Sequence, residues 1–108
     1  MANKIASLIL EEEKRQQDSL MMIPSENYAS KAVREAMGSI LMNKYSEGYP
    51  HRRYYQGNKI IDEIEILAED LAKKLFKVPF VNVQPYSGSP ANAEVLFALL
   101  NYGDKIMG

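Results

Sequence analysis

The strongest indication of fold class lies in Phe80-Val81-Asn82-Val83-Gln84-Pro85-Tyr86-Ser87-Gly88-Ser89-Pro90, where two kinds of secondary structure are expected to meet. Residues 80–84 alternate with β-branched side chains and predict a short strand that Pro85 ends. Ser89 places a capping hydroxyl before a proline, and the apolar run 91–100 predicts a well-buried helix. Because residues 105–108 are typical of the opening of another strand, we expect an α/β fragment whose sheet is incomplete.

Two helices are expected upstream of this stretch. Ser30 can cap the first, whose apolar residues repeat at helical spacing as far as Leu41. Asn58 can cap the second, which carries acidic residues early and lysines late, in the order that the helix dipole favours. Residues 5–9 have one apolar helical stripe and predict an N-terminal arm with a single apolar turn that can pack on a partner surface. Residues 19–23 predict a short strand or extended segment.

Between the two helices, residues 43–58 lose all periodicity and predict a long loop, NKYSEGYPHRRYYQGN. Its tyrosines and arginines could stack on a flat ligand or bind a carboxylate, and Glu47 could transfer a proton. A protein interface is enriched in the same residue types, so these residues alone leave a ligand site and an interface equally favoured.

The turn 86–89 lies where backbone N–H groups and a helix dipole would converge on an anion such as phosphate. An ordinary serine-capped turn explains the same residues, and the local pattern alone favours it. Neither a P-loop nor a three-glycine dinucleotide fingerprint is present in the sequence.

Composition excludes several classes of function. The 108 residues have a formal net charge of -1, which offers no broad electrostatic surface for nucleic acid or anionic lipid. The absence of cysteine excludes a disulfide framework and a cysteine-based zinc site and fits a reducing cytosol. No signal peptide or apolar run of membrane-spanning length is found, so we expect no membrane partner and a cytoplasmic location.

Four motifs, in this order and spacing, together resemble the serine hydroxymethyltransferase family: IPSENY at 23–28, NKYSEGYP at 43–50, RYY at 53–55 and NVQPYSGS at 82–89. The resemblance covers nearly the whole chain. It implies a parent with the α/β fold of type I pyridoxal-phosphate enzymes, the aspartate-aminotransferase-like fold. Residues 1–24 would form an N-terminal arm and 25–108 the truncated start of the large cofactor domain, itself mostly helical with one or two short strands.

The resemblance also implies an activity, the reversible conversion of serine and tetrahydrofolate into glycine and 5,10-methylenetetrahydrofolate with pyridoxal 5'-phosphate. The parent would be a homodimer with a shared active site. In the family the Schiff-base lysine lies downstream of this segment, so we expect the isolated chain to be inactive. Two alternatives stay open: a stand-alone helical interaction or dimerisation module, and another fold-type I enzyme such as a threonine aldolase, which would keep the phosphate turn but not the tyrosine-rich loop.

Cofactor-binding residues follow from the resemblance by motif. Ser87, Gly88 and Ser89 are similar to the residues that hold the cofactor phosphate in the family, and they coincide with the turn described above. Tyr45 is similar to the tyrosine that reaches this phosphate from the neighbouring subunit.

Substrate-binding and catalytic residues are implied in the same way. Glu47 resembles the acid/base glutamate near the substrate hydroxyl and the folate. Tyr54 and Tyr55 resemble the paired tyrosines that line the substrate and folate pocket, with a catalytic role for Tyr55, and Ser25 resembles the residue near the amino-acid carboxylate.

Four positions depart from the family pattern, namely Pro24 in place of alanine, His51 and Gln56 in place of glycine, and Tyr86 in place of histidine. None of these removes a proposed catalytic group. His51 and Gln56 put the loop conformation in question, because a residue that replaces glycine cannot freely adopt a positive φ angle. His51, the single histidine, has no acidic or thiol cluster beside it in the sequence and is expected to be a loop residue, so no metal site is predicted.

Overall fold

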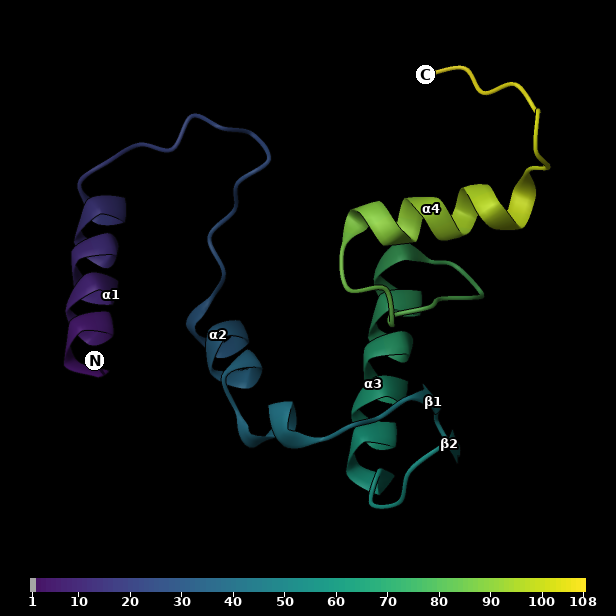
Figure 1. The fold of residues 1–108 in the computed structure, drawn as a ribbon, viewed down its shortest axis with the longest axis horizontal. Coiled ribbons are helices and arrows are strands. Elements are labelled where there is room, and N and C mark those ends of the chain that lie inside the picture. The colour runs from purple at the N-terminus through teal and green to yellow at the C-terminus, as the bar shows by residue number, and fades with distance from the viewer. Residues whose placement is uncertain (1) are drawn as a thin grey trace. The chain divides into compact units, whose positions relative to one another are not determined.

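The computed structural model describes residues 2–108, and the chain forms two compact units, residues 1–39 and 40–108 (Figure 1). The first unit contains two helices, α1 (Ala2–Gln17) and α2 (Lys31–Met37). The second contains a 3-10 helix, two short strands and two helices: η1 (Ile40–Asn43), β1 (Gly48–Tyr49), β2 (Arg52–Arg53), α3 (Lys59–Phe76) and α4 (Gly88–Leu99).

Helix α1 is longer than the single apolar turn that the sequence predicts. Its 16 residues continue through the charged stretch, where Arg15 pairs with Glu12 at 2.7 Å. The guanidinium of Arg15 and the amide of Gln16 lower the pKa of the Glu12 carboxyl to about 2. Favourable i,i+3 and i,i+4 pairs of this kind support an exposed helix beyond its apolar stripe.

Helix α2 begins as predicted and ends early. The Ser30 hydroxyl accepts a hydrogen bond from the Val33 N–H at 3.3 Å, which confirms the predicted cap. The helix ends at Met37, whereas the sequence predicts helix as far as Leu41; residues 40–43 form η1 instead. The last turn closes there, because the Gly38 N–H donates to the Arg34 carbonyl at 3.0 Å and the Ser39 N–H donates to the Ala36 carbonyl at 3.3 Å, a tighter i,i+3 bond. Upstream of Ser30, residues 19–23 form no strand, and the chain turns after Ile23, whose carbonyl accepts from the Glu26 N–H.

The predicted long loop, 43–58, contains a small hairpin. Strands β1 and β2 pair antiparallel, with Gly48 opposite Arg53 and Tyr49 opposite Arg52. Pro50 and His51 form the two-residue turn between them. Helix α3 follows Asn58 as predicted, but the Asn58 side chain makes no capping bond and turns toward the loop instead.

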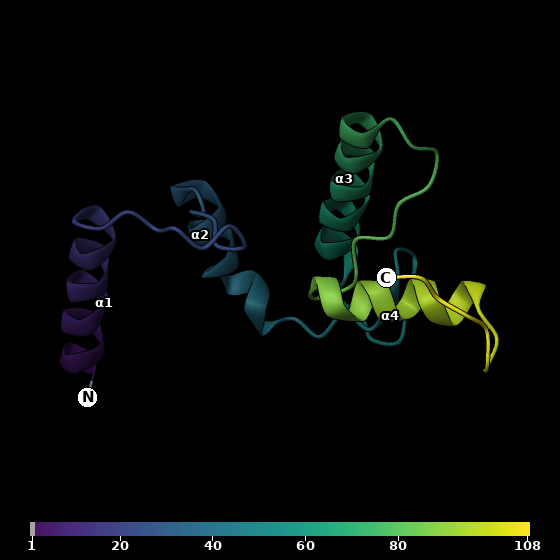
Figure 2. The same ribbon diagram turned by 90° about the horizontal axis from the view of Figure 1, so that it is seen from above.

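Two predicted strands and one predicted cap are wrong. Residues 80–84 and 105–108 have no strand pairing, because a strand requires a neighbour for its backbone groups and the described residues supply none there. Helix α4 begins at Gly88 with Ser87 as its N-cap, so Ser89 and Pro90 lie in the first turn instead of preceding it. After α4 the chain turns back on itself toward Gly108 (Figure 2).

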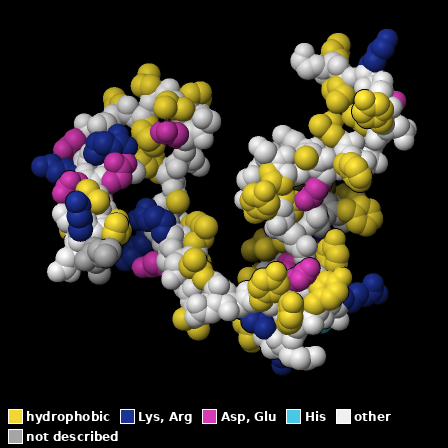
Figure 3. Space-filling view, viewed as in Figure 1, with side chains coloured by type: hydrophobic (Ala, Val, Ile, Leu, Met, Phe, Trp, Pro, Cys, Tyr) yellow, Lys and Arg dark blue, Asp and Glu magenta, His cyan; other side chains and the backbone are white. Residues whose placement is uncertain are grey.

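Apolar side chains are exposed throughout the described residues, and no hydrophobic side chain among them is buried (Figure 3). Helix α4 is mostly apolar without a single apolar face, although it includes Asn92 and Glu94, and Phe97 within it is 92% exposed. A helix of this composition is normally covered by other structure. Polar contacts therefore hold the second unit together. No helix in residues 2–108 has both the length and the apolar character that crossing a membrane requires.

Candidate functional site

Arg53 is the centre of a polar cluster in the second unit. Its Nη1 donates to the carbonyl oxygens of Ser46 and Gly48, both at 2.8 Å. Its Nε donates to Asp62 Oδ1 at 2.7 Å, and its Nη2 donates to Glu65 Oε2. The arginine side chain is only 4% exposed. One planar guanidinium thus joins the loop 44–58 to the first two turns of α3.

The backbone around Glu47 is held at three consecutive carbonyls. The carbonyls of Ser46 and Gly48 accept from Arg53, and the carbonyl of Glu47 itself accepts from the Tyr54 N–H at 3.2 Å. The carboxylate of Glu47, in contrast, has no hydrogen bond or ion pair with any described residue. The fold therefore fixes where this side chain starts and leaves its acid group available to a ligand.

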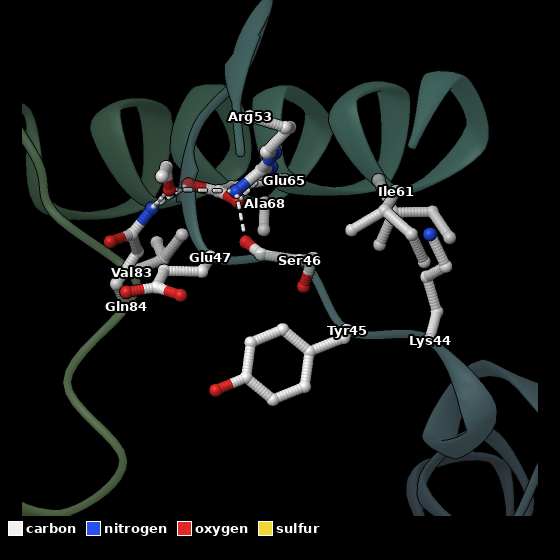
Figure 4. Close-up of a pocket in the computed structure, with 12 residues that line it drawn as sticks. Lys44, Tyr45, Ser46, Glu47, Arg53, Ile61, Glu65, Ala68, Val83 and Gln84 are labelled. Carbon is white, nitrogen blue, oxygen red and sulfur yellow. Dashed lines mark hydrogen bonds and ion pairs between the residues drawn. The ribbon is translucent and has the colours of Figure 1, made fainter. Parts of the chain in front are cut away.

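An open depression of about 660 Å³ lies beside this backbone. Tyr45, Glu47, Arg53 and Gln84 contribute to its lining together with residues of α3. Figure 4 shows Arg53 and Glu65 meeting at α3, while the Tyr45 ring and the Glu47 carboxylate extend away from that helix. The depression thus has a rigid ion-paired side and a side that presents a phenol and a carboxylate.

Charge pairing shifts the pKa values of the clustered groups. Burial lowers the pKa of Arg53, but the hydrogen bonds to Glu65 and Asp62 outweigh it, so the net shift is upward. The pKa of Asp62 is lowered, first by the hydrogen bond from the His51 N–H and then by Arg53. Both groups are therefore held in their charged forms.

Tyr45 and Tyr55 meet across the loop. Their ring centroids lie 5.3 Å apart and the ring planes are at 88°, an edge-to-face contact of the kind that stabilises aromatic pairs. Asn58 supports both residues, because its Nδ2 donates to the Tyr55 carbonyl at 2.9 Å and to the Tyr45 carbonyl at 3.5 Å. Lys44 closes the loop base by donating to the Gln56 carbonyl.

Of His51 and Gln56, the two residues that stand where the family commonly has glycine, one adopts a positive φ angle. His51 has φ 63°, in the left-handed region, and its N–H donates to Asp62 Oδ2 at 3.0 Å. Gln56 has no positive φ; the neighbouring Gly57 does, at 78°. The backbone bond to Asp62 thus compensates for strain at His51.

The turn before α4 has the features of an anion site. Ser87 is the N-cap residue, yet its hydroxyl makes no capping hydrogen bond. The N–H groups of Gly88 and Ser89 have no acceptor among the described residues, and a side chain built at Gly88 would meet no atom within 4 Å. An open helix N-terminus with a free hydroxyl is suited to binding an anion such as phosphate.

The structure brings some of the predicted site residues together and separates others. Tyr45 and Glu47 line one depression, and Tyr55 packs on Tyr45. Tyr54 is 76% exposed and does not line that depression. The turn 87–89 belongs to the same unit but lies outside the depression, and Ser25 lies in the turn that follows Ile23 in the first unit.

The partners of Arg53 were not anticipated from the sequence. The sequence indicates only that Asp62 and Glu65 are early acidic residues that suit the helix dipole and that Gln84 belongs to a predicted strand. The available signal was spacing: acids three apart on a helix lie on one face and can bind one guanidinium. No group of three or more potential ligand residues for a metal occurs within residues 2–108.

Comparison with known proteins gives consistent matches. The family model described as serine hydroxymethyltransferase matches residues 1–108. A serine hydroxymethyltransferase of Acidothermus cellulolyticus is 61% identical over 104 residues, covering 96% of this chain and 24% of the relative. One from Desulfotalea psychrophila is 59% identical over 105 residues, covering 97% of this chain and 25% of the relative. The chain therefore spans about a quarter of the length of the curated relatives it matches.

Proposed function

This chain belongs to the serine hydroxymethyltransferase family, and from that premise we propose that it contributes part of an active site for interconverting serine and tetrahydrofolate with glycine and 5,10-methylenetetrahydrofolate. The parent is a cytoplasmic, homodimeric transferase with the type I fold of pyridoxal-phosphate enzymes. The rest of its active site comes from polypeptide beyond the quarter that this chain represents.

The proposal rests on the arrangement at Glu47. Its backbone is fixed by hydrogen bonds to three successive carbonyls, while its carboxylate is unpaired and lines a depression beside Tyr45. A general acid or base must have a defined position and a free carboxyl, and both conditions are met.

The turn 87–89 is the part of the chain suited to the cofactor. The Ser87 and Ser89 hydroxyls and the N–H groups of Gly88 and Ser89 would hold the phosphate, with Tyr45 of the neighbouring subunit as a further donor. When bound, pyridoxal phosphate supplies an electron sink for bond cleavage at the amino-acid substrate.

The remaining side chains bind and orient the substrates. Glu47 holds or moves a proton at the serine hydroxyl oxygen, next to the folate. Tyr55, fixed by its edge contact with Tyr45, and the exposed Tyr54 line the substrate and folate pocket. Ser25 contacts the amino-acid carboxylate.

The test is Glu47→Gln in the full-length protein. The amide keeps the shape of the side chain but cannot exchange a proton, so the kcat of folate-dependent serine cleavage should fall about 10²- to 10⁴-fold. Binding of pyridoxal phosphate, followed by absorbance, should be unchanged. Glu63→Gln is the matched control, because Glu63 is an exposed acid of α3 without a salt bridge. Wild-type turnover in Glu47→Gln would contradict the acid/base role.

A further inference from the structure

Gln84 makes two hydrogen bonds that reach far along the sequence. Its Nε2 donates to the Gly48 carbonyl at 2.8 Å and to Glu65 Oε1 at 2.7 Å, across 36 and 19 positions respectively. Both acceptors are shared with Arg53, which donates to the same carbonyl and to the other oxygen of the same carboxylate. Gln84, Gly48, Arg53 and Glu65 therefore form a closed ring of hydrogen bonds (Figure 4).

The backbone at Gln84 is also fixed. Its N–H donates to the Asn82 side-chain oxygen at 2.9 Å, a local Asx-type turn. Three residues later the chain reaches Ser87, the N-cap of α4. The position of Gln84 is thus set from its own segment, and its amide connects that segment to the loop.

Resting on the proposed function, we infer that Gln84 is a positioning residue that sets the backbone of the loop that carries Glu47. One link holds the Gly48 carbonyl, adjacent to Glu47, and the other holds Glu65 on α3. Within unit 40–108, these two bonds join the segment after Val78 to the loop and to α3. Without them the segment that contains Gln84 would lose its links to the backbone beside Glu47 and to α3.

Three variants of the full-length protein test this inference. Gln84→Met removes both donors at similar side-chain length, and Gln17→Met is the control, since Gln17 is an exposed residue without side-chain hydrogen bonds. Gln84→Asn keeps the amide on a side chain that is one methylene shorter, so the amide no longer reaches its two acceptors. This variant replaces Gln84→Met in the comparison with wild type if Gln84→Met does not fold. In both Gln84 variants, amide hydrogen exchange should accelerate in segments 44–58 and 80–89, without a matching change in α1.

Kinetics distinguish positioning from a general structural role. The kcat of Gln84→Met should fall on the order of 10-fold, with pyridoxal phosphate still bound, because misplacing a proton-transfer group lowers the rate without preventing binding. In a Glu47→Gln background the same change should cost almost nothing more, because Gln84 acts through Glu47. Additive losses in the double variant would overturn the inference.

The exchange experiment separates this inference from the proposed function. If the full-length protein does not cleave serine with folate, the proposed function fails, yet accelerated exchange in 44–58 would still establish the link. Unchanged exchange in both Gln84 variants would overturn the link whether or not the enzyme is active. If Glu47→Gln has no kinetic effect, the claim that Gln84 acts through Glu47 is refuted.

Discussion

Arg53 Nε lies 2.7 Å from Asp62 Oδ1, although the two residues come from different elements, strand β2 and the first turn of α3. Asp62 also accepts from the His51 N–H through its other oxygen. One carboxylate thus binds both the hairpin turn and the guanidinium that holds the Glu47 loop. The geometry of the candidate active site depends on this pair.

The first prediction concerns the shape of the cation at position 53. Arg53→Lys keeps the charge but cannot donate to four acceptors in one plane, so the carbonyls of Ser46 and Gly48 lose their fixed donor. The kcat of the full-length enzyme should fall about 10- to 100-fold through misplacement of Glu47. The control is Arg52→Lys, because Arg52 is the preceding residue and is exposed. An equal fall in kcat for the two variants would argue against a positioning role for the Arg53 guanidinium.

The second prediction concerns pH. The folded-state pKa of Asp62 lies below its ordinary value of 3.8, so its contribution to stability is fully present above that value and is lost as pH falls toward the folded pKa. Asp62→Asn should therefore lower the Tm of the full-length protein at neutral pH, and the difference from wild type should shrink in melts below about pH 4. Asp70→Asn, in an exposed pair with Lys73, should show little difference at any pH.

The third prediction concerns backbone strain in the hairpin. His51 has φ 63°, a conformation that costs a non-glycine residue energy, so His51→Gly should raise the free energy of unfolding by about 0.5–1 kcal/mol. The N–H that binds Asp62 is retained in this variant. His51→Ala removes the same side chain without relieving the strain. If denaturant melts show that His51→Ala raises the free energy of unfolding as much as His51→Gly does, loss of the imidazole and not relief of the positive φ is the cause.

The fourth prediction concerns the subunit on which Tyr45 acts. In the parent dimer we expect Tyr45 to serve the neighbouring active site, so a Tyr45→Phe subunit mixed with a subunit lacking the cofactor-binding lysine should regain activity. The lysine of the first subunit would then work with the intact Tyr45 of the second. Unmixed preparations of each variant are the controls. No activity gain on mixing, with heterodimers demonstrated by mass, would place Tyr45 in its own subunit's site.

The local sequence predicted part of the structure well. Three features depend on interactions within a few residues: the Ser30 cap, the start of α3 after Asn58, and the unusual backbone conformation that a residue in place of glycine meets at His51. The strand at 80–84 was wrong because β structure requires a partner strand that local pattern cannot supply. The end of α2 at Gly38 was missed because the cap there ends the helix although the apolar repeat continues to Leu41. The hairpin 48–53 was missed because its short pairing depends on the contacts of Arg53, which the local sequence does not reveal.

The sequence by itself determined family membership and the identities of the candidate groups, because motifs such as those at 43–50 and 82–89 are linear and survive any arrangement in space. Only the tertiary structure decided how those groups are held. The ring of Arg53, Glu65, Gly48 and Gln84 joins residues up to 36 positions apart, and each member is unremarkable in its own segment. Its hydrogen bonds depend on distance and angle, which are set only when the loop, α3 and the segment before α4 come together.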